Sequence, residues 1–332
     1  MKSPQVALGT FFVCTFQKSY NVSKLYVTIA FAGKMFNLEC LICERFMWIY
    51  VLIFLLIFIL ACVGVIYHDT HNFVVRYYDV TTDKLDKDFT FVLLSDLHGY
   101  VFGQDNDRLI KAINDISPDA VLCAGDMFTA HPIDGEIRYQ AGLNVLTSLA
   151  AKFPVYAGNG NHEHKIKTFT GEFGNLFDRY RSKLNKAGVI TLEDESVVIP
   201  NTNIRITGLD LEHDYFRKVV KKEMDDDCIP RHVGHSDSNY FQVLIAHNPQ
   251  YFPNYAKWGA DLTVSGHVHG GIIRLPILGG VISPAIALFP KYDGGKFVIG
   301  NKTMILSRGL GTHSIHVRMF NPGEVVVIKV HA

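Results

Sequence analysis

Short apolar runs and amphipathic stretches alternate over most of the chain after residue 70. Five mostly apolar runs have the composition of strands buried in an α/β sheet, at 91–94, 121–123, 153–156, 243–245 and 262–264. Apolar residues at helical spacing predict helices at 105–117, 135–151, 176–187 and 211–224. Further strands are predicted at 72–80 (an edge strand), 189–192, 196–199, 204–207, 297–299, 303–307 and 324–330, with a polar loop at 225–238. The pattern as a whole predicts an α/β domain.

An uncharged apolar segment, Phe46 to Tyr67, precedes this domain. A transmembrane helix needs about 20 apolar residues. Trp48, Tyr50 and Tyr67 lie near its ends, where aromatic side chains favour the membrane interfaces. We therefore predict one transmembrane helix over 46–67, with a buried core helix as the alternative. The domain that follows is predicted to cover 68–332.

Residues 1–45 match neither the membrane segment nor the domain. Their apolar stretches, at 6–16 and 25–33, are too short to span a bilayer, and no convincing signal-peptide cleavage site follows them. We expect this part to be a disordered leader or the product of a mis-assigned translation start.

The charges that flank the apolar segment do not determine membrane orientation, but the charge balance of the rest of the chain argues against a nucleic-acid partner. Basic residues flank the apolar segment on both sides, so the positive-inside rule has little asymmetry to act on. A short leader before a large domain favours a single-pass protein of the cell membrane with its domain outside the cytoplasm. Beyond residue 45 the chain has 30 acidic and 27 basic residues. It therefore lacks the basic footprint of a nucleic-acid-binding protein, and no protein partner is predicted.

Polar clusters follow most of the buried strands. In chain order they are Asp96-Leu97-His98, Gly125-Asp126, Gly158-Asn159-Gly160-Asn161-His162-Glu163, Ala246-His247-Asn248 and Gly266-His267-Val268-His269-Gly270. Because ligands of α/β sheets collect beyond the carboxyl ends of the strands, these side chains are expected at one rim. Seven of them are candidate metal ligands: Asp96, His98, Asp126, Asn161, His247, His267 and His269.

Seven ligands are too many for one tetrahedral site, and no cysteine is among them. Carboxylate, amide and imidazole ligands favour Mn²⁺, Fe²⁺/³⁺ or Zn²⁺ over thiolate-preferring ions. A shared carboxylate lets two such ions lie about 3.5–4 Å apart, where they clamp a phosphoryl group and acidify a bridging water. A single histidine is more often a core residue, and a Gly-Asp pair more often a turn. The ordered set nevertheless favours a site for two divalent metal ions.

This ordered set resembles the calcineurin-like metallophosphoesterase superfamily, whose pattern is D-x-H, G-D, G-N-H-[DE], a lone His and G-H-x-H. The resemblance runs from Asp96 to His269 and implies a four-layer αββα sandwich of two mixed sheets. It also implies that metal one is held by Asp96, His98, Asp126 and His269, and metal two by Asp126, Asn161, His247 and His267. His162 is then the catalytic acid or a charge-stabilising histidine, and Glu163 is a candidate for orienting it.

Further motifs, at 266–271, 307–311 and 317–324, narrow the resemblance to membrane-anchored metallophosphoesterases. That branch is similar to a bacterial enzyme that cleaves UDP-2,3-diacylglucosamine. Val268 and Ile272 stand where Thr and Gln are usual, a departure that concerns substrate contacts rather than metals. The sequence 127–130 replaces the D-R-G extension of protein Ser/Thr phosphatases, which argues against a phosphoprotein substrate.

Two residues outside the metal set are candidate substrate contacts. The glycine-containing loop after 307 could bring Arg308 to a phosphate, with an exposed charge as the alternative, and His313 is the second candidate. The basic residues of the predicted helix at 211–224 favour a solvated face, with a cap on anionic lipid headgroups as the alternative.

The sequence therefore predicts a membrane-anchored, two-metal hydrolase of a phosphodiester or pyrophosphate bond. Its substrate is a phosphorylated small molecule or lipid, and the anchor and the family branch favour a lipid-linked or nucleotide-lipid substrate. The alternative is a tethered phosphodiesterase of small soluble phosphodiesters. A third hypothesis is a non-catalytic metal-binding scaffold, although a scaffold would have no use for His162.

Overall fold

The computed structural model describes residues 11–19, 22–31, 34–39, 41–132, 136–217, 221–275, 278–281, 288–312 and 316–332, with side chains from Met47 onward. The chain divides into two compact units, 1–64 and 65–332. The boundary lies within helix α1 (Leu41–His71), close to the predicted domain start at residue 68.

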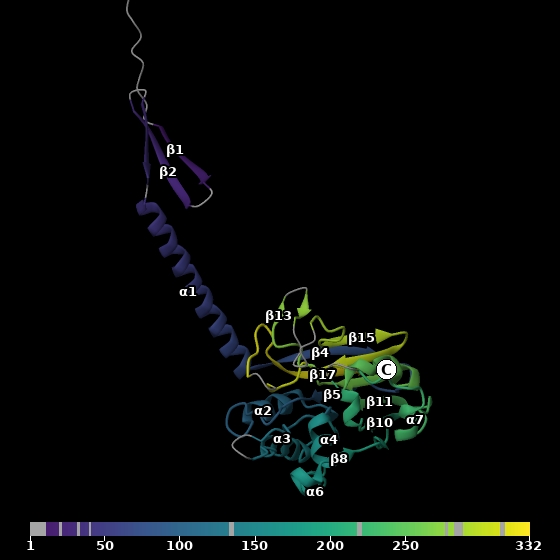
Figure 1. Cartoon of the computed structure of the whole chain (residues 1–332). Helices are drawn as coiled ribbons and strands as arrows, with labels where there is room; N and C mark the ends of the chain where they lie inside the picture. Colours follow the sequence, from purple (N-terminus) through teal and green to yellow (C-terminus); the bar gives the residue numbers. More distant parts are fainter. Residues whose placement is uncertain are drawn as a thin grey trace, which may run out of the picture. The chain divides into compact units, whose positions relative to one another are not determined.

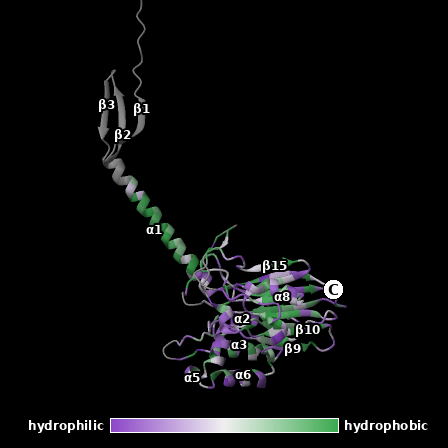
Figure 2. Cartoon of the chain, turned by 45° about the vertical axis from the view of Figure 1, so that its right-hand side comes forward, coloured by the Kyte–Doolittle hydropathy of each residue, from purple (hydrophilic) through white to green (hydrophobic). Residues whose placement is uncertain are grey.

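The first unit holds a small sheet and most of the apolar helix. Strands β1 (Phe11–Ser19), β2 (Val22–Phe31) and β3 (Lys34–Glu39) pair antiparallel, so the described part of the expected leader contains regular strands. Within α1, the 25-residue stretch from Met47 to His71 is long and apolar enough to cross a bilayer. Figure 2 shows the hydrophobic character of this helix along its described length. The bilayer crossing itself stays a prediction.

The second unit is built on two six-stranded mixed sheets. The first has the order β4 (Phe73–Thr81), β17 (Gly323–His331), β5 (Phe89–Leu94), β6 (Ala120–Cys123), β7 (Val155–Gly158) and β8 (Ile190–Leu192). Strand β17 runs parallel to β4 and antiparallel to β5. Figure 1 shows β4 and β17 side by side, although they come from opposite ends of the unit. The edge position predicted for 72–80 is confirmed.

The second sheet has the order β15 (Gly295–Ile299), β16 (Lys302–Leu306), β12 (Leu262–Ser265), β11 (Phe241–Ala246), β10 (Ile204–Leu209) and β9 (Glu195–Val198). Its central strands are parallel and its two edge strands antiparallel to them. A two-stranded ribbon, β13 (Arg274–Leu275) and β14 (Gly279–Gly280), lies outside both sheets.

Alternating side chains of each sheet enter different cores, as the two-residue period of a strand requires. On β5, Phe91 and Leu93 belong to a buried cluster shared by both sheets, whereas Val92 and Leu94 belong to a cluster shared with helices. Those helices are α2 (Asp107–Ile116), α3 (Gln140–Ala150), α4 (Asn161–Thr168) and α6 (Leu176–Lys186). Helices α7 (Cys228–Val233) and α8 (Phe252–Trp258) cover the other face of the second sheet. The predicted mixed α/β fold is confirmed, and its layers follow the order helix, sheet, sheet, helix.

The helix predicted at 211–224 is wrong over its described residues. Only a single 3₁₀ turn, η1 (His213–Phe216), forms there, and Arg217 is already extended. Side chains of the segment 248–251 donate hydrogen bonds to backbone carbonyls of this stretch. Asn248 Nδ2 donates to Tyr215 O (2.7 Å), and Tyr251 Oη donates to Lys222 O (2.8 Å). These tertiary bonds replace the helical ones. The loop predicted at 225–238 contains α7 instead.

Candidate dinuclear metal centre

The predicted metal ligands all lie in the segments that directly follow strand ends. Asp96 and His98 follow β5, Asp126 follows β6, Asn161 opens α4 after β7, His247 follows β11, and His267 and His269 follow β12. Strands β5, β6 and β7 are neighbours in the first sheet, and β11 and β12 are neighbours in the second. The carboxyl ends of two packed sheets therefore bring these side chains together, as the sequence predicts.

Five of these residues have left-handed backbone conformations. The φ angles are 52° at Asp96, 48° at His98, 54° at Asp126, 77° at His267 and 53° at His269. Such angles are uncommon outside glycine, although Asp and His adopt them more readily than most residues. Backbone strain of this kind clusters at functional sites, where the surrounding structure must hold it in place.

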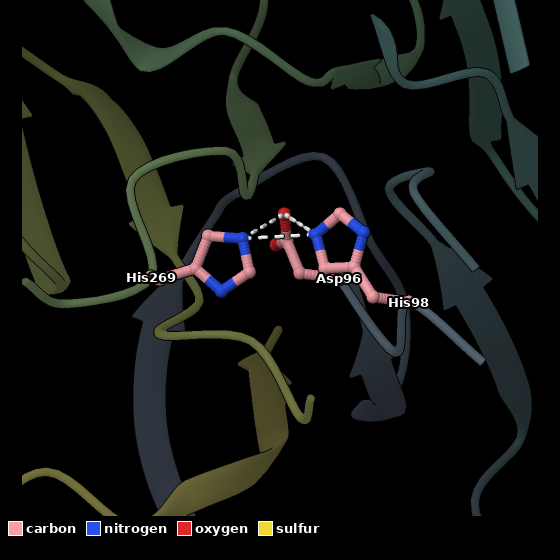
Figure 3. Close-up of side chains that lie close together, drawn as sticks. All are labelled: Asp96, His98 and His269. Carbon is pink, nitrogen blue, oxygen red and sulfur yellow. Dashed lines mark hydrogen bonds and ion pairs between the residues drawn. The ribbon is translucent and has the colours of Figure 1, made fainter. Parts of the chain in front are cut away.

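The first group of coordinating atoms belongs to Asp96, His98 and His269. The two Nε2 atoms of His98 and His269 lie 3.0 Å apart, and Asp96 Oδ1 lies 3.4 Å from His269 Nε2 and 3.8 Å from His98 Nε2. In Figure 3 both imidazole rings face the Asp96 carboxylate from opposite sides. All three residues are buried. Their ligand atoms therefore converge on one small volume.

The second group belongs to Asp126, His247 and His267. His247 Nε2 lies 3.0 Å from Asp126 Oδ2, and His267 Nδ1 lies 2.8 Å from Asn161 Oδ1, so the amide predicted as a ligand lies beside this group. The same Asp126 oxygen lies 3.9 Å from His98 Nε2 of the first group. Asp126 is thus placed between the two groups, where a bridging carboxylate would have to be.

Burial and charge together set the electrostatics of the centre. Asp96 is 0% and Asp126 2% exposed. Burial raises the pKa of Asp96 to about 6 despite the opposing charge of His247. Burial would also raise the pKa of Asp126, but His247 and His162 hold it well below its usual range. Burial acts to lower the pKa of His247, yet the two carboxylates raise it to about 10.

The donor set fits two divalent cations. In each group the candidate ligand atoms lie within 4.8 Å of one another, and two buried carboxylates need compensating positive charge. Nitrogen and oxygen donors without thiolate suit Mn²⁺, Fe²⁺/³⁺ or Zn²⁺. Which residues bind which ion stays a prediction.

Two glycines allow the ligand-bearing segments to approach one another closely. A Cβ atom on Gly160 would collide with the Asp126 carboxylate, and one on Gly266 would collide with the Asp96 carboxylate. Gly160 and Gly266 are therefore required by space at the ligands, which is more specific than a general turn preference.

His162 lies beside His98 and Asp126 and has a defined hydrogen bond on one ring nitrogen. Ala130 N–H donates to His162 Nδ1 (2.8 Å), and His162 N–H donates to Asp126 Oδ1 (2.9 Å). One candidate set of ligand atoms combines His98, Asp126 and His162. Because Nδ1 accepts a backbone N–H, the neutral ring carries its proton on Nε2.

Glu163 holds three backbone N–H groups of the site, and its orientation of the His162 ring stays a prediction. Its carboxylate accepts backbone N–H groups of Asp126 (2.7 Å), Met127 (2.8 Å) and Gly160 (3.0 Å). It thereby ties the segment of Asp126 to the start of α4, so it positions Asp126 and the helix bearing His162. Burial and the Asp126 charge raise its pKa to about 8.

A cavity of about 1040 Å³ opens beside the second group. Asp126, Asn161, His162 and His267 line it, as does Val268, so the departure from the usual Thr lies on the cavity side. Its other lining includes the basic residues Lys165, Arg217, Lys221, Lys222 and Lys291 and the apolar residues Phe216, Met224, Leu288, Phe289 and Pro290. The lysines that the sequence placed on a solvated helix face thus border a cavity.

Of the two candidate substrate contacts, the structure describes Arg308 and not His313. Arg308 lies beside the buried Glu324, with its Nε 3.7 Å from Glu324 Oε2, and its backbone N–H donates to Glu324 Oε1 (2.8 Å). The 3.7 Å separation involves Nε alone and is longer than a hydrogen bond, and a contact of the guanidinium with substrate stays a prediction. His313 lies outside the described residues.

No role is predicted from the sequence for Asn321 and Arg318, which bond to the segments around the first ligand group. Asn321 is completely buried and donates to the backbone of His269. The only signal was the resemblance of the tail at 317–324, which carried no role for these residues.

Comparison with known proteins agrees with this geometry. A family model described as calcineurin-like phosphoesterase matches residues 89–271, more than half of the chain. The uncharacterized metallophosphoesterase of Aquifex aeolicus (strain VF5) is 28% identical over 279 residues, which cover 82% of this chain and 98% of that protein. The uncharacterized metallophosphoesterase YkuE of Bacillus subtilis (strain 168) is 26% identical over 250 residues, covering 73% and 79%. Phosphodiesterase YaeI of Escherichia coli (strain K12) is 27% identical over 230 residues, covering 68% and 76%.

The family match contains all seven predicted metal ligands and His162. Together with relatives named metallophosphoesterase and phosphodiesterase, it identifies a hydrolase and argues against the non-catalytic scaffold. Metallophosphoesterases of this kind depend on two metal ions, for which the structure offers candidate ligands. The chain belongs to the calcineurin-like phosphoesterase family.

Proposed function

We propose that this protein is a membrane-anchored, two-metal phosphohydrolase that cleaves a phosphodiester or pyrophosphate bond in a lipid-linked or nucleotide-lipid substrate. The observation that carries the proposal is the cavity beside the second ligand group, which combines cationic and apolar side chains over candidate metal ligands. Such a lining suits a molecule with a phosphate at one end and an apolar chain at the other.

The cavity lining includes apolar side chains of two kinds. Phe216 lies near the ligands, with its ring centroid 5.2 Å from that of His267 and 6.0 Å from that of His247. Leu288 and Phe289, by contrast, are 66% and 57% exposed. Large exposed apolar side chains beside a polar site favour an apolar ligand or a membrane surface. A phosphate at the ligands would therefore place an attached chain toward Leu288 and Phe289.

The ligand sets proposed are those of the family pattern, with Asp126 shared between both ions. Metal one takes Asp96, His98, Asp126 and His269, and metal two takes Asp126, Asn161, His247 and His267. When bound, the ions supply Lewis acidity toward the phosphoryl oxygens and lower the pKa of water.

The protein's own contribution centres on His162. Its Nδ1 accepts the Ala130 N–H, so Nε2 is the atom that can donate toward a leaving-group or phosphoryl oxygen. Lys165, on the same helix, and Lys291 border the cavity and can neutralise further phosphate charge. Glu163 keeps Asp126 and the start of α4 in register.

The proposed anchor is α1, and the proposed location is the cell membrane with the hydrolase domain outside the cytoplasm. The length and apolar character of Met47–His71 support a span. Protease added to intact cells would digest a domain outside the cytoplasm and spare one inside it.

The substrate class is tested with two matched compounds and full-length protein in detergent with Mn²⁺. Both contain the same nucleoside diphosphate ester, one with an octyl chain and one with a methyl group. Since each buried methylene is worth about 0.8 kcal/mol, burial of even two methylenes raises kcat/KM about tenfold for the octyl compound. Equal kcat/KM values would instead favour the tethered phosphodiesterase of small soluble phosphodiesters.

A further inference from the structure

The C-terminal end of α1, from Val65, belongs to the hydrolase unit, and its last turns contain buried polar residues. Asp69 is only 6% and Thr70 8% exposed. Asn321 N–H donates to Asp69 Oδ2 (2.9 Å), and Arg318 N–H donates to Thr70 Oγ1 (3.3 Å). Two consecutive helix residues thus hold the segment from 318 to 321.

That segment in turn holds the loop that carries His269. Asn321 has no exposed surface. Its Nδ2 donates to His269 O and Gly271 O, both at 2.7 Å. His269 has a left-handed backbone with a φ of 53°. A conformation of this kind persists only where its surroundings fix it, and the Asn321 amide supplies two of the fixing bonds.

The same segment also holds the loop that lies against Asp96. The buried Arg318 guanidinium donates to the backbone carbonyls of Arg308 (3.0 Å), Gly309 (3.2 Å) and Gly311 (3.1 Å from Nε). Gly311 N–H donates to Asp96 O at 2.8 Å. Both segments that frame the first ligand group are therefore anchored to residues 318–321.

Two members of the second ligand group, His247 and Asp126, have other supports. His247 Nδ1 lies 2.6 Å from Ala124 O, and the backbone of Asp126 is held by Glu163. These contacts lie within the hydrolase core and do not involve α1 or residues 318–321.

We propose that Asp69 and Asn321 are positioning residues for the metal held by Asp96, His98 and His269, so that the end of α1 is part of the scaffold of the metal centre. The inference rests on the proposed two-metal function and deepens it. In this role α1 does more than anchor the protein, because one residue, Asn321, contacts both the end of the helix and the backbone of the metal ligand His269. Residues that support a ligand in this way typically change metal affinity about 10–100-fold when they are lost.

The test uses full-length protein in detergent, with Mn²⁺ binding measured by equilibrium dialysis and the coupling of the two ions followed by electron paramagnetic resonance. The wild type is expected to bind two ions, which give the spectrum of a coupled pair. Asp69→Ala is expected to keep one tight site, to weaken the other about 10–100-fold, and to show the spectrum of a single Mn²⁺. Asp69→Asn is expected to resemble the wild type, because its amide oxygen can still accept the Asn321 N–H.

Asp115→Ala serves as the matched control, because Asp115 is an exposed residue that pairs with Lys111 on the same helix. It is expected to bind two ions like the wild type. Where Asp69→Ala does not fold, as judged by circular dichroism, Asn321→Ser carries the test, since it removes the donors to 269 and 271 but keeps the backbone bond to Asp69.

Two outcomes separate this inference from the function on which it rests. A wild type that binds two ions, with a folded Asp69→Ala or Asn321→Ser that binds both with unchanged affinity, overturns the positioning role and leaves the proposed function intact. A wild type that binds no ion overturns both. Equal weakening of both ions in the variant also contradicts the inference, because it would indicate a general loss of structure.

Discussion

The two ligand groups use the same residue types but are supported from different parts of the chain. In the group of Asp126, His247 and His267, the first two residues are held within the hydrolase core, and the group lies beside the cavity. The group of Asp96, His98 and His269 is backed by Asn321 and, through it, by the end of α1, both outside the family match at 89–271. A family motif can therefore supply all the ligands while the support of one part of a site lies elsewhere in the chain.

The largest expected effect comes from Asp126→Asn, which removes the carboxylate between the groups. We expect loss of both metal ions and of essentially all activity, because a bridging carboxylate holds the pair. Metal analysis of the purified variant checks this. Asp210→Asn is the control: Asp210 is also buried but bonds to His164 and Lys167, so the variant should lose stability and keep both ions. Two ions retained in Asp126→Asn would refute the shared-ligand assignment.

Replacing His162 tests whether its imidazole takes part in catalysis. His162→Gln should keep both metals and lower kcat by about 10²–10⁴, the usual contribution of an acid or base. If His162 protonates the leaving group, the loss shrinks for a nitrophenol ester. An equal loss for good and poor leaving groups indicates charge stabilisation by Nε2–H instead. His331→Gln, at a surface histidine bonded to Asp79 and Asp88, should leave kcat unchanged.

Two truncations separate anchoring from support of the first ligand group. Removal of residues 1–64 keeps Asp69 and Thr70, so we expect a protein with two metal sites. Removal of residues 1–71 also deletes the acceptors of Asn321 and Arg318 and should weaken one site about 10–100-fold. Dialysis against Mn²⁺ distinguishes the two proteins. Identical binding would mean that the helix end contributes nothing to the metal centre.

The smallest effect is expected at the outer edge of the cavity. Leu288→Ser combined with Phe289→Ser should lower kcat/KM about tenfold for an octyl phosphodiester, because less apolar surface is buried on binding. The methyl analogue should be hydrolysed as before. Val298→Ser alters a similarly exposed apolar residue on β15 and should affect neither substrate. A loss of equal size with the methyl compound would contradict an apolar subsite.

The strands and the ligand-bearing clusters could be predicted because each is a local signal. A short apolar run followed by Asp-x-His specifies both a buried strand and the polar residues at its end, and Asp96 and His98 lie where this pattern indicates. The full ordered set then identified the fold. Helix 211–224 failed for the opposite reason, since its carbonyls bond to Asn248 and Tyr251, which are distant in sequence.

The residues that hold the metal ligands in place could not be predicted from local sequence patterns either. Nothing near Asp69 indicates that a residue at the end of an apolar helix meets Asn321, which is 252 positions away. The left-handed backbone of the ligands and the role of Glu163 likewise depend on tertiary contacts. Sequence predicted which atoms could bind metals, whereas the structure was needed to identify what holds those atoms in place.

The central claim, a hydrolase that works with two metal ions, is tested most directly by titrating metal against activity. Full-length protein is stripped with a chelator, and Mn²⁺ is added back while hydrolysis of an aryl phosphodiester is measured. A two-metal hydrolase should have no activity after stripping and should recover fully at about two ions per chain. Full activity in the stripped protein, or a maximum at one ion with no second site, would contradict it.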